Sequence, residues 1–146
     1  MLSFIQEKFQ KRVMQWCSMA ELRFNREFPI ITVFARIEGE KTRRIKVALD
    51  TGATFVMIPW EVAEILGYNP GASPKKRKII TASGIQHVPL VVLISMSVLE
   101  MEAHNVEALV HNLPKESNVD GLLGLTFLRN FKICLDFRKG VLSIKS

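Results

Sequence analysis

The sequence of 146 residues is poor in cysteine, with only Cys17 and Cys134. Two cysteines are too few for a disulfide-stapled secreted scaffold or a four-cysteine zinc site. We interpret both as buried, inert thiols in a reducing compartment, the cytoplasm. His-Glu-x-x-His and Cys-x-x-Cys pairs are also missing, as is a glycine-rich phosphate loop. We therefore expect no metal and no cofactor.

The sequence also has no long, purely apolar run. Its longest stretch without a charged residue is 79–99, which contains serines and threonine together with Gly84 and Pro89. That composition favours two buried strands and a turn over a transmembrane helix. Near the N-terminus, Glu7 and Lys8 interrupt the apolar region that a secretory signal requires. We expect a soluble protein with no membrane span.

A positive charge is present but dispersed. The sequence has 20 Lys+Arg against 14 Asp+Glu, a net charge of +6. The tight basic cluster at 75–78 is interpreted as a solvated surface run on a loop. We expect no nucleic-acid partner, although association with a nucleic acid or an acidic membrane remains a weaker alternative.

Residues 3–20 have the periodicity of a helix, and Ser3 with Gln6 has the form of a capping box. The apolar positions that share one face are Leu2, Ile5, Phe9, Val13, Trp16 and Ala20. We expect residues 1–28 to be a helical extension packed on the domain or across a subunit interface. A peripheral membrane contact through its basic polar side is the alternative.

Residues 29–146 are expected to form one mainly β domain, because short β-branched segments alternate with turns about every ten residues. Short helices are expected at 59–66, between Pro59 and Gly67, and near 125–130. The strands are expected at 30–37, 43–49, 78–82, 85–99, 103–110, 131–137 and 141–145.

The segment with the clearest chemical signal is Asp50-Thr51-Gly52-Ala53, which directly follows the apolar strand 43–49. Gly52 allows a tight turn, and we expect the Thr51 hydroxyl to fix it by a hydrogen bond. A carboxylate at the end of a buried strand is a candidate functional acid. The plain alternative is that Asp50 only caps a turn.

This segment resembles the active-site loop of the retropepsin-like aspartic proteases, the single-domain relatives of pepsin, and the resemblance extends over roughly 30–145. A second landmark at 119–124 is similar to the support that packs against that loop in the family, with Leu122, Leu123 and Gly124 as its apolar pair and glycine. The residues that resemble the flap tip are Thr81, Ala82, Ser83 and Gly84. The closing hairpin after 135–137 is similar to that of microbial members.

The resemblance implies a closed β-barrel of the retropepsin or pepsin-half type and an aspartic endopeptidase. Family members use two facing Asp-Thr-Gly loops. This chain has one, because Asp120-Gly121 lacks the threonine and lies where the support belongs. The implied enzyme is a homodimer in which each subunit contributes Asp50 to activate a water molecule, acting on a peptide or an unfolded protein.

The resemblance also implies further roles. Thr51 would hold the two loops in register, and the flap would close over substrate. Candidate linings of apolar substrate pockets are Ile58, Ile80, Ile85 and Leu122. The runner-up interpretation is a non-catalytic or weakly catalytic module of the same fold that binds peptides or dimerises.

Overall fold

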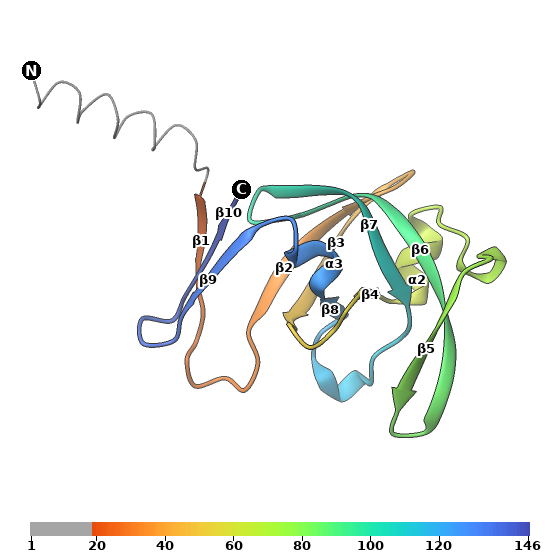
Figure 1. Ribbon diagram of the computed structural model, residues 1–146, viewed down its shortest axis with the longest axis horizontal. Helices are drawn as coiled ribbons and strands as arrows, with labels where there is room; N and C mark the ends of the chain where they lie inside the picture. The colour runs from red at the N-terminus through yellow and green to blue at the C-terminus, as the bar shows by residue number, and fades with distance from the viewer. Residues whose placement is uncertain (1–18) are drawn as a thin grey trace, which may run out of the picture.

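The computed structural model describes residues 19–146, which form two sheets and two short α-helices (Figure 1). Six strands close a barrel, because β2 pairs with β3 at one edge and with β6 at the other. In order around the barrel they are β2 (Thr32–Glu38), β3 (Thr42–Leu49), β8 (Gly121–Leu123), β4 (Val56–Ile58), β7 (Met101–Val110) and β6 (Gly84–Val98). The closed, mainly β barrel expected from the sequence is confirmed.

Four further strands lie outside this barrel. The antiparallel sheet β1 (Met19–Arg23), β10 (Val141–Lys145) and β9 (Lys132–Asp136) lies beside it, and β5 (Lys76–Thr81) adds to β6 as an edge strand. The helices α2 (Trp60–Ile65) and α3 (Leu125–Leu128) and the 3-10 turns Pro70–Ala72 and Lys115–Ser117 connect the strands. Among the residues described, we find no helix long and apolar enough to cross a membrane.

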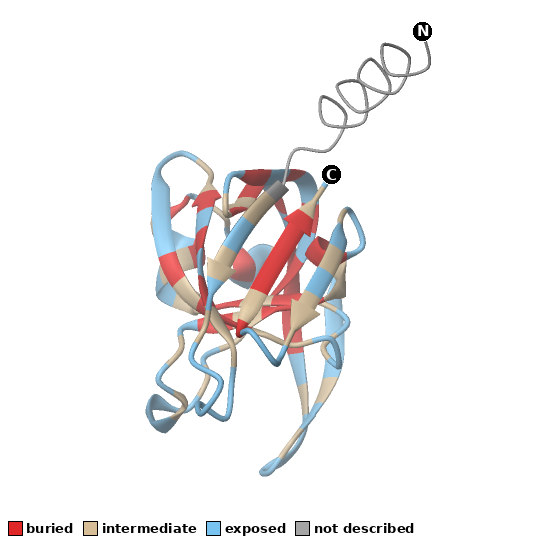
Figure 2. Cartoon of the chain, turned by 90° about the vertical axis from the view of Figure 1, so that its left-hand side faces the viewer, coloured by how far each residue is buried: buried red, intermediate tan, exposed pale blue. Residues whose placement is uncertain are grey.

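One continuous core fills the barrel and extends under the three-stranded sheet. Figure 2 shows the buried stretches on the strands and the exposed ones on the loops and hairpin tips. Alternation along β2 buries Val33, Ala35 and Ile37, and Phe127 of α3 is fully buried against the same core. Burial of these side chains is the main stabilising contribution, at about 1.5–3 kcal/mol for each large one.

Most of the expected elements are confirmed within one to three residues. Pro59 is the N-cap of α2 rather than its first residue, and Gly67 follows the helix with a φ of 84°. The strands β4 and β8 were not expected as strands. Each is three residues long, which is too short to show an alternation.

The expected N-terminal helix lies mostly outside the described residues. Its last two positions are in β1, so the helical prediction is wrong there, and 19–28 as a whole contains a strand and turns rather than a helix. These residues form a strand because β1 pairs with β10, with Met19 opposite Lys145 and Arg23 opposite Val141 in the register. Ala20 packs against the core while Glu21 is exposed, a period of two rather than 3.6.

Two smaller expectations are also corrected. Cys134 is exposed, not buried, because on the edge strand β9 it alternates with Ile133 and Leu135, which pack against the core. Three residues of the basic cluster lie on β5 rather than on a loop, although all are exposed as expected. Cys17 lies outside the described residues.

Candidate active site

Asp50 lies at the point where β3 leaves the barrel. Val47 and Ala48, just before it, are buried, whereas Asp50 itself is half-buried. Its backbone N–H donates to the Leu123 carbonyl at 3.2 Å, and the Leu49 N–H donates to Ile31 at 2.8 Å. The strand therefore delivers the carboxylate to the rim of the barrel with its backbone held on both sides.

The turn after Asp50 is fixed by Asp50 itself. The Gly52 N–H donates to Asp50 Oδ1 at 2.9 Å, and the Ala53 N–H donates to the Asp50 carbonyl at 3.2 Å. An N–H donor stabilises the ionised carboxylate and sets its orientation. Thr51 is exposed, and within residues 19–146 its hydroxyl makes no hydrogen bond, so the expected bond across the turn is wrong.

Strand β8 supports this loop from inside, as the second landmark suggested. It runs parallel to β3, with Leu122 opposite Ala48 and Leu123 opposite Leu49. Leu123 is fully buried and Leu122 half-buried. The backbone of Gly124 lies so close to that of Phe55 that a Cβ at position 124 would be 2.3 Å from the Phe55 carbonyl oxygen. Only glycine permits that approach without displacing the loop.

Helix α3 holds the far end of the loop through residues that the sequence did not single out. The Leu125 N–H donates to the Ala53 carbonyl at 2.9 Å, and the Thr126 N–H donates to the Thr54 carbonyl at 3.0 Å. Thr126 Oγ1 also accepts from the Val56 N–H at 2.9 Å and donates to the Glu107 carbonyl at 2.7 Å. One hydroxyl therefore joins the start of β4, the helix and β7. A lone threonine in a helix carries no sequence signal of that role.

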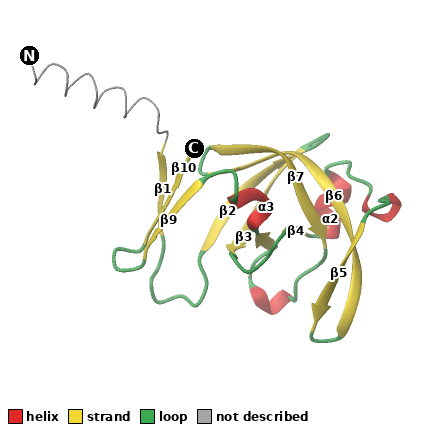
Figure 3. Ribbon diagram, viewed as in Figure 1, coloured by secondary structure: helices red, strands yellow, loops and turns green. Residues whose placement is uncertain are grey.

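The residues expected at the flap tip form the turn of the β5–β6 hairpin, which projects beyond the barrel (Figure 3). Thr81 pairs with Gly84, Ala82 and Ser83 make the two-residue turn, and Gly84 has a φ of 111°. Thr81 Oγ1 donates to the Gly84 carbonyl at 3.1 Å. Within the described residues, no hydrogen bond joins this tip to the Asp50 loop.

The base of the hairpin does contact the segment after the Asp50 loop. Phe55 and Ile79 pack against a small buried cluster of Val88, Leu90 and Leu109, and the Arg77 guanidinium lies 5.9 Å from the Phe55 ring centroid. Of the expected pocket linings, Ile80 and Ile85 are 84% and 57% exposed beside the hairpin tip. Ile58 is wrong as a lining residue, because it is fully buried in the main core.

The remaining acids and histidines form no metal centre in this part of the chain. Asp120 has a structural role: its Oδ2 accepts from the Lys46 N–H at 2.8 Å, and its own N–H donates to the Lys46 carbonyl. Asp136 anchors the last hairpin turn by accepting from Lys139 N–H at 2.9 Å. Over 19–146 no three His, Cys, Asp or Glu side chains group in a way that could hold a metal ion.

Comparison with known proteins agrees with this geometry. The family model described as aspartyl protease matches residues 33–127, which include the Asp50 loop, the hairpin and the β8 support. No curated protein matches the chain. Among solved structures, a retropepsin-like aspartic protease from Rickettsia conorii superposes with a TM-score of 0.68 at 24% identity, covering 88% of this chain and 91% of that one. The chain therefore belongs to the aspartyl protease family and has the retropepsin-like fold.

Proposed function

We propose that this protein is an endopeptidase that acts as a homodimer, with one Asp50 from each subunit forming a single catalytic pair. The observation that carries the proposal is the Asp50 carboxylate, held at the barrel rim by the Gly52 N–H and half open to solvent. Membership of the aspartyl protease family supports peptide hydrolysis as the chemistry. The chain contains one such loop, so a pair requires a second copy.

The exposed side of the loop supports association of two copies there. Thr51 and Gly52 are exposed, whereas Ala53 and Asp50 are half-buried. The inner side is occupied by Leu123 and by helix α3. A second copy could therefore approach only from the Thr51 side, where each threonine would hold the partner's loop in register.

In the proposed mechanism the two carboxylates share one proton, because two like charges at short range cannot both ionise. The ionised Asp50 takes a proton from a bound water, and the water oxygen attacks the peptide carbonyl carbon. The protonated Asp50 donates a hydrogen bond to the carbonyl oxygen as negative charge develops there. The resulting tetrahedral intermediate breaks its C–N bond as the amine gains the proton that the first Asp50 took from the water. No acyl-enzyme forms.

The exposed hairpin is the proposed cover of the substrate. Ile80 and Ile85 form a cross-strand pair beside the Ala82-Ser83 turn and are largely exposed. Closure of this hairpin over a bound peptide would bury both side chains and exclude water. The extended peptide would add backbone hydrogen bonds as a strand does, and its side chains would enter apolar pockets.

The decisive experiment compares Asp50→Asn with Asp120→Asn on a denatured protein substrate. Asparagine keeps the size of both side chains, and at position 120 its oxygen can still accept the Lys46 N–H. We expect Asp50→Asn to lose cleavage by a factor of at least about 10³, since it removes the acid–base group. Asp120→Asn should retain it. Binding of substrate by the wild type without any cleavage would favour the module interpretation.

Subunit mixing tests the shared site. If one site needs two Asp50 carboxylates, an equal mixture of wild-type and Asp50→Asn subunits leaves about a quarter of the dimers with both. Activity should fall to that fraction of the wild-type value after exchange, and dilution should reduce specific activity through the dimer dissociation constant. Half of the activity after mixing, or a fully active monomer in sedimentation, would contradict the shared site.

A further inference from the structure

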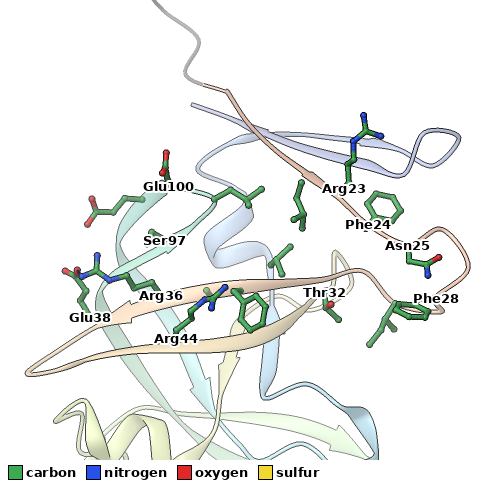
Figure 4. A pocket seen from close by; sticks show the side chains of 17 residues that line it. Arg23, Phe24, Asn25, Phe28, Thr32, Arg36, Glu38, Arg44, Ser97 and Glu100 are labelled. Atoms are coloured by element: carbon green, nitrogen blue, oxygen red, sulfur yellow. Dashed lines mark ion pairs between the residues drawn. The ribbon is translucent and has the colours of Figure 1, made fainter.

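A groove with a volume of about 820 Å³ separates β1 from β2 (Figure 4). One wall comes from β1 and the loop after it, the other from β2, and the turn after β6 closes one end. Its apolar lining consists of Leu22, Phe24, Phe28, Ile30, Phe34 and Leu99. Asp50 and the hairpin tip are not part of it.

The groove is more apolar than a surface exposed to water should be. Phe28 is 66% exposed, Phe34 50% and Ile30 43%, and all three lie along it. Large apolar side chains that gather in one hollow mark a binding surface rather than ordinary exposed residues. The groove therefore lacks an apolar occupant within the described part of the chain.

The charges beside the groove indicate what kind of occupant fits. The Arg36 guanidinium is paired with Glu38 at 3.0 Å, and the Arg44 guanidinium lies 3.9 Å above the Phe34 ring. At the closed end Glu100 is exposed and makes no ion pair within 19–146, and Glu102 lies beside it. Glu102 accepts from the Ser95 hydroxyl and lies 3.7 Å from His104 Nε2, whereas Arg23 on the β1 wall makes no ion pair within 19–146. The groove therefore carries unpaired charge of both signs, and an apolar segment with a cation fits its Glu100 end.

Residues 1–18 have that chemistry. Their helical spacing puts Leu2, Ile5, Phe9, Val13 and Trp16 on one stripe, and it places Lys8 and Arg12, four residues apart, along one side of that stripe. The segment joins the groove wall directly, because Met19 is the first residue of β1. A helix of about 16 residues is about 24 Å long. The short connection gives the segment a high effective concentration at the groove.

We propose that residues 1–18 dock as an amphipathic helix in the groove between β1 and β2 of their own chain. The apolar stripe covers Phe28, Ile30 and Phe34, and Lys8 and Arg12 lie toward Glu100. This interaction does not depend on the proposed peptidase activity, because the groove does not include Asp50.

Trp16 provides a direct reporter in the full-length protein. The chain has two tryptophans, so a Trp60→Phe background leaves Trp16 as the only one. We expect blue-shifted emission and low acrylamide quenching. Phe28→Glu in the groove, or Phe9→Glu in the segment, should shift the emission to the red and increase quenching several-fold. Ile94→Glu is the matched control, since Ile94 is 60% exposed on β6 and outside the groove.

Circular dichroism of each variant checks that the barrel remains folded, and Phe9→Glu leaves the sequence of residues 19–146 unchanged. Fully exposed Trp16 in the wild type would overturn the proposal. So would a shift that appears only with vesicles containing acidic lipid, which would make the segment a membrane-surface helix. An emission maximum that moves to the red on dilution would also overturn it, because the segment would then dock on a second copy.

Discussion

The Thr126 hydroxyl offers the most specific test of how the Asp50 loop is held. It accepts from the Val56 N–H at 2.9 Å and donates to the Glu107 carbonyl at 2.7 Å, so it connects β7 to the start of β4, where the segment after Asp50 ends. Thr126→Val keeps the shape of the side chain and removes both bonds. Thr126→Ser keeps the hydroxyl and removes one methyl group, which makes it the matched control.

The expected loss follows from the burial of Val56, whose exposed fraction is zero. Its N–H would be left without a partner, which costs about 1–3 kcal/mol, and the lost bond to Glu107 adds about 1 kcal/mol. We expect Thr126→Val to lower the free energy of unfolding by about 2–4 kcal/mol. For a chain of this length, this corresponds to a fall in Tm on the order of 10 °C.

Thermal unfolding at one fixed protein concentration measures this change, and amide exchange of Val56 locates it. The Val56 amide should exchange much faster in Thr126→Val than in the wild type. Thr126→Ser should lose about 1 kcal/mol or less. The reasoning is refuted if Thr126→Val is within about 0.5 kcal/mol of the wild type, or if Thr126→Ser is equally destabilised.

Two further substitutions test neighbouring contacts. Gly124→Ala should destabilise the protein by about 1–3 kcal/mol in thermal unfolding, because its Cβ would lie 2.3 Å from the Phe55 carbonyl oxygen. Gly71→Ala is the control and should change the stability little, since its Cβ would lie 3.9 Å from its nearest neighbour. Equal effects of the two substitutions would contradict this reasoning. Burial raises the pKa of Tyr68 above its usual 10.0. The Tyr68 hydroxyl donates to the Glu38 carbonyl at 2.7 Å and accepts from the Ile94 N–H at 2.7 Å, so loss of both bonds in Tyr68→Phe should cost about 1–3 kcal/mol at pH 8 in urea titrations. Because the folded-state pKa is raised, the wild type loses stability as pH rises above 10, and the difference should shrink in stronger alkali.

The sequence predicted the long strands and the tight turn after Asp50 because both have local causes, although the Thr51 hydrogen bond expected there does not form within the described residues. An eight-residue strand such as β3 shows its apolar character within its own residues, and Asp50-Thr51-Gly52 forms its turn from its own atoms. The β-branched and aromatic residues of 30–37 likewise predicted a strand, and buried and exposed side chains alternate along β2. Where local preference and tertiary pairing agree, a single sequence is sufficient to predict the element.

The missed features depend on partners distant in the chain. Strands β4 and β8 are three residues each and exist because they pair with β7 and β3. Ala20 follows a helical spacing but becomes part of a strand because β10, more than 120 residues later, is beside it. Thr126 contacts Val56 across 70 positions. No local pattern encodes such contacts, since they arise only when the barrel closes.

The hydrogen bonds from β8 and α3 that hold the Asp50 loop lie on its inner side, and this leaves its outer side available to the proposed dimer. Leu123, Leu125 and Thr126 hold its inner side by hydrogen bonds, while Thr51 on its outer side makes none within 19–146. The restraints that shape the loop therefore come from the subunit itself. Association would have to position two preformed loops rather than fold them, which lowers the conformational entropy lost on dimerisation. Each of the two carboxylates would then reach the shared site already oriented by its own Gly52 N–H.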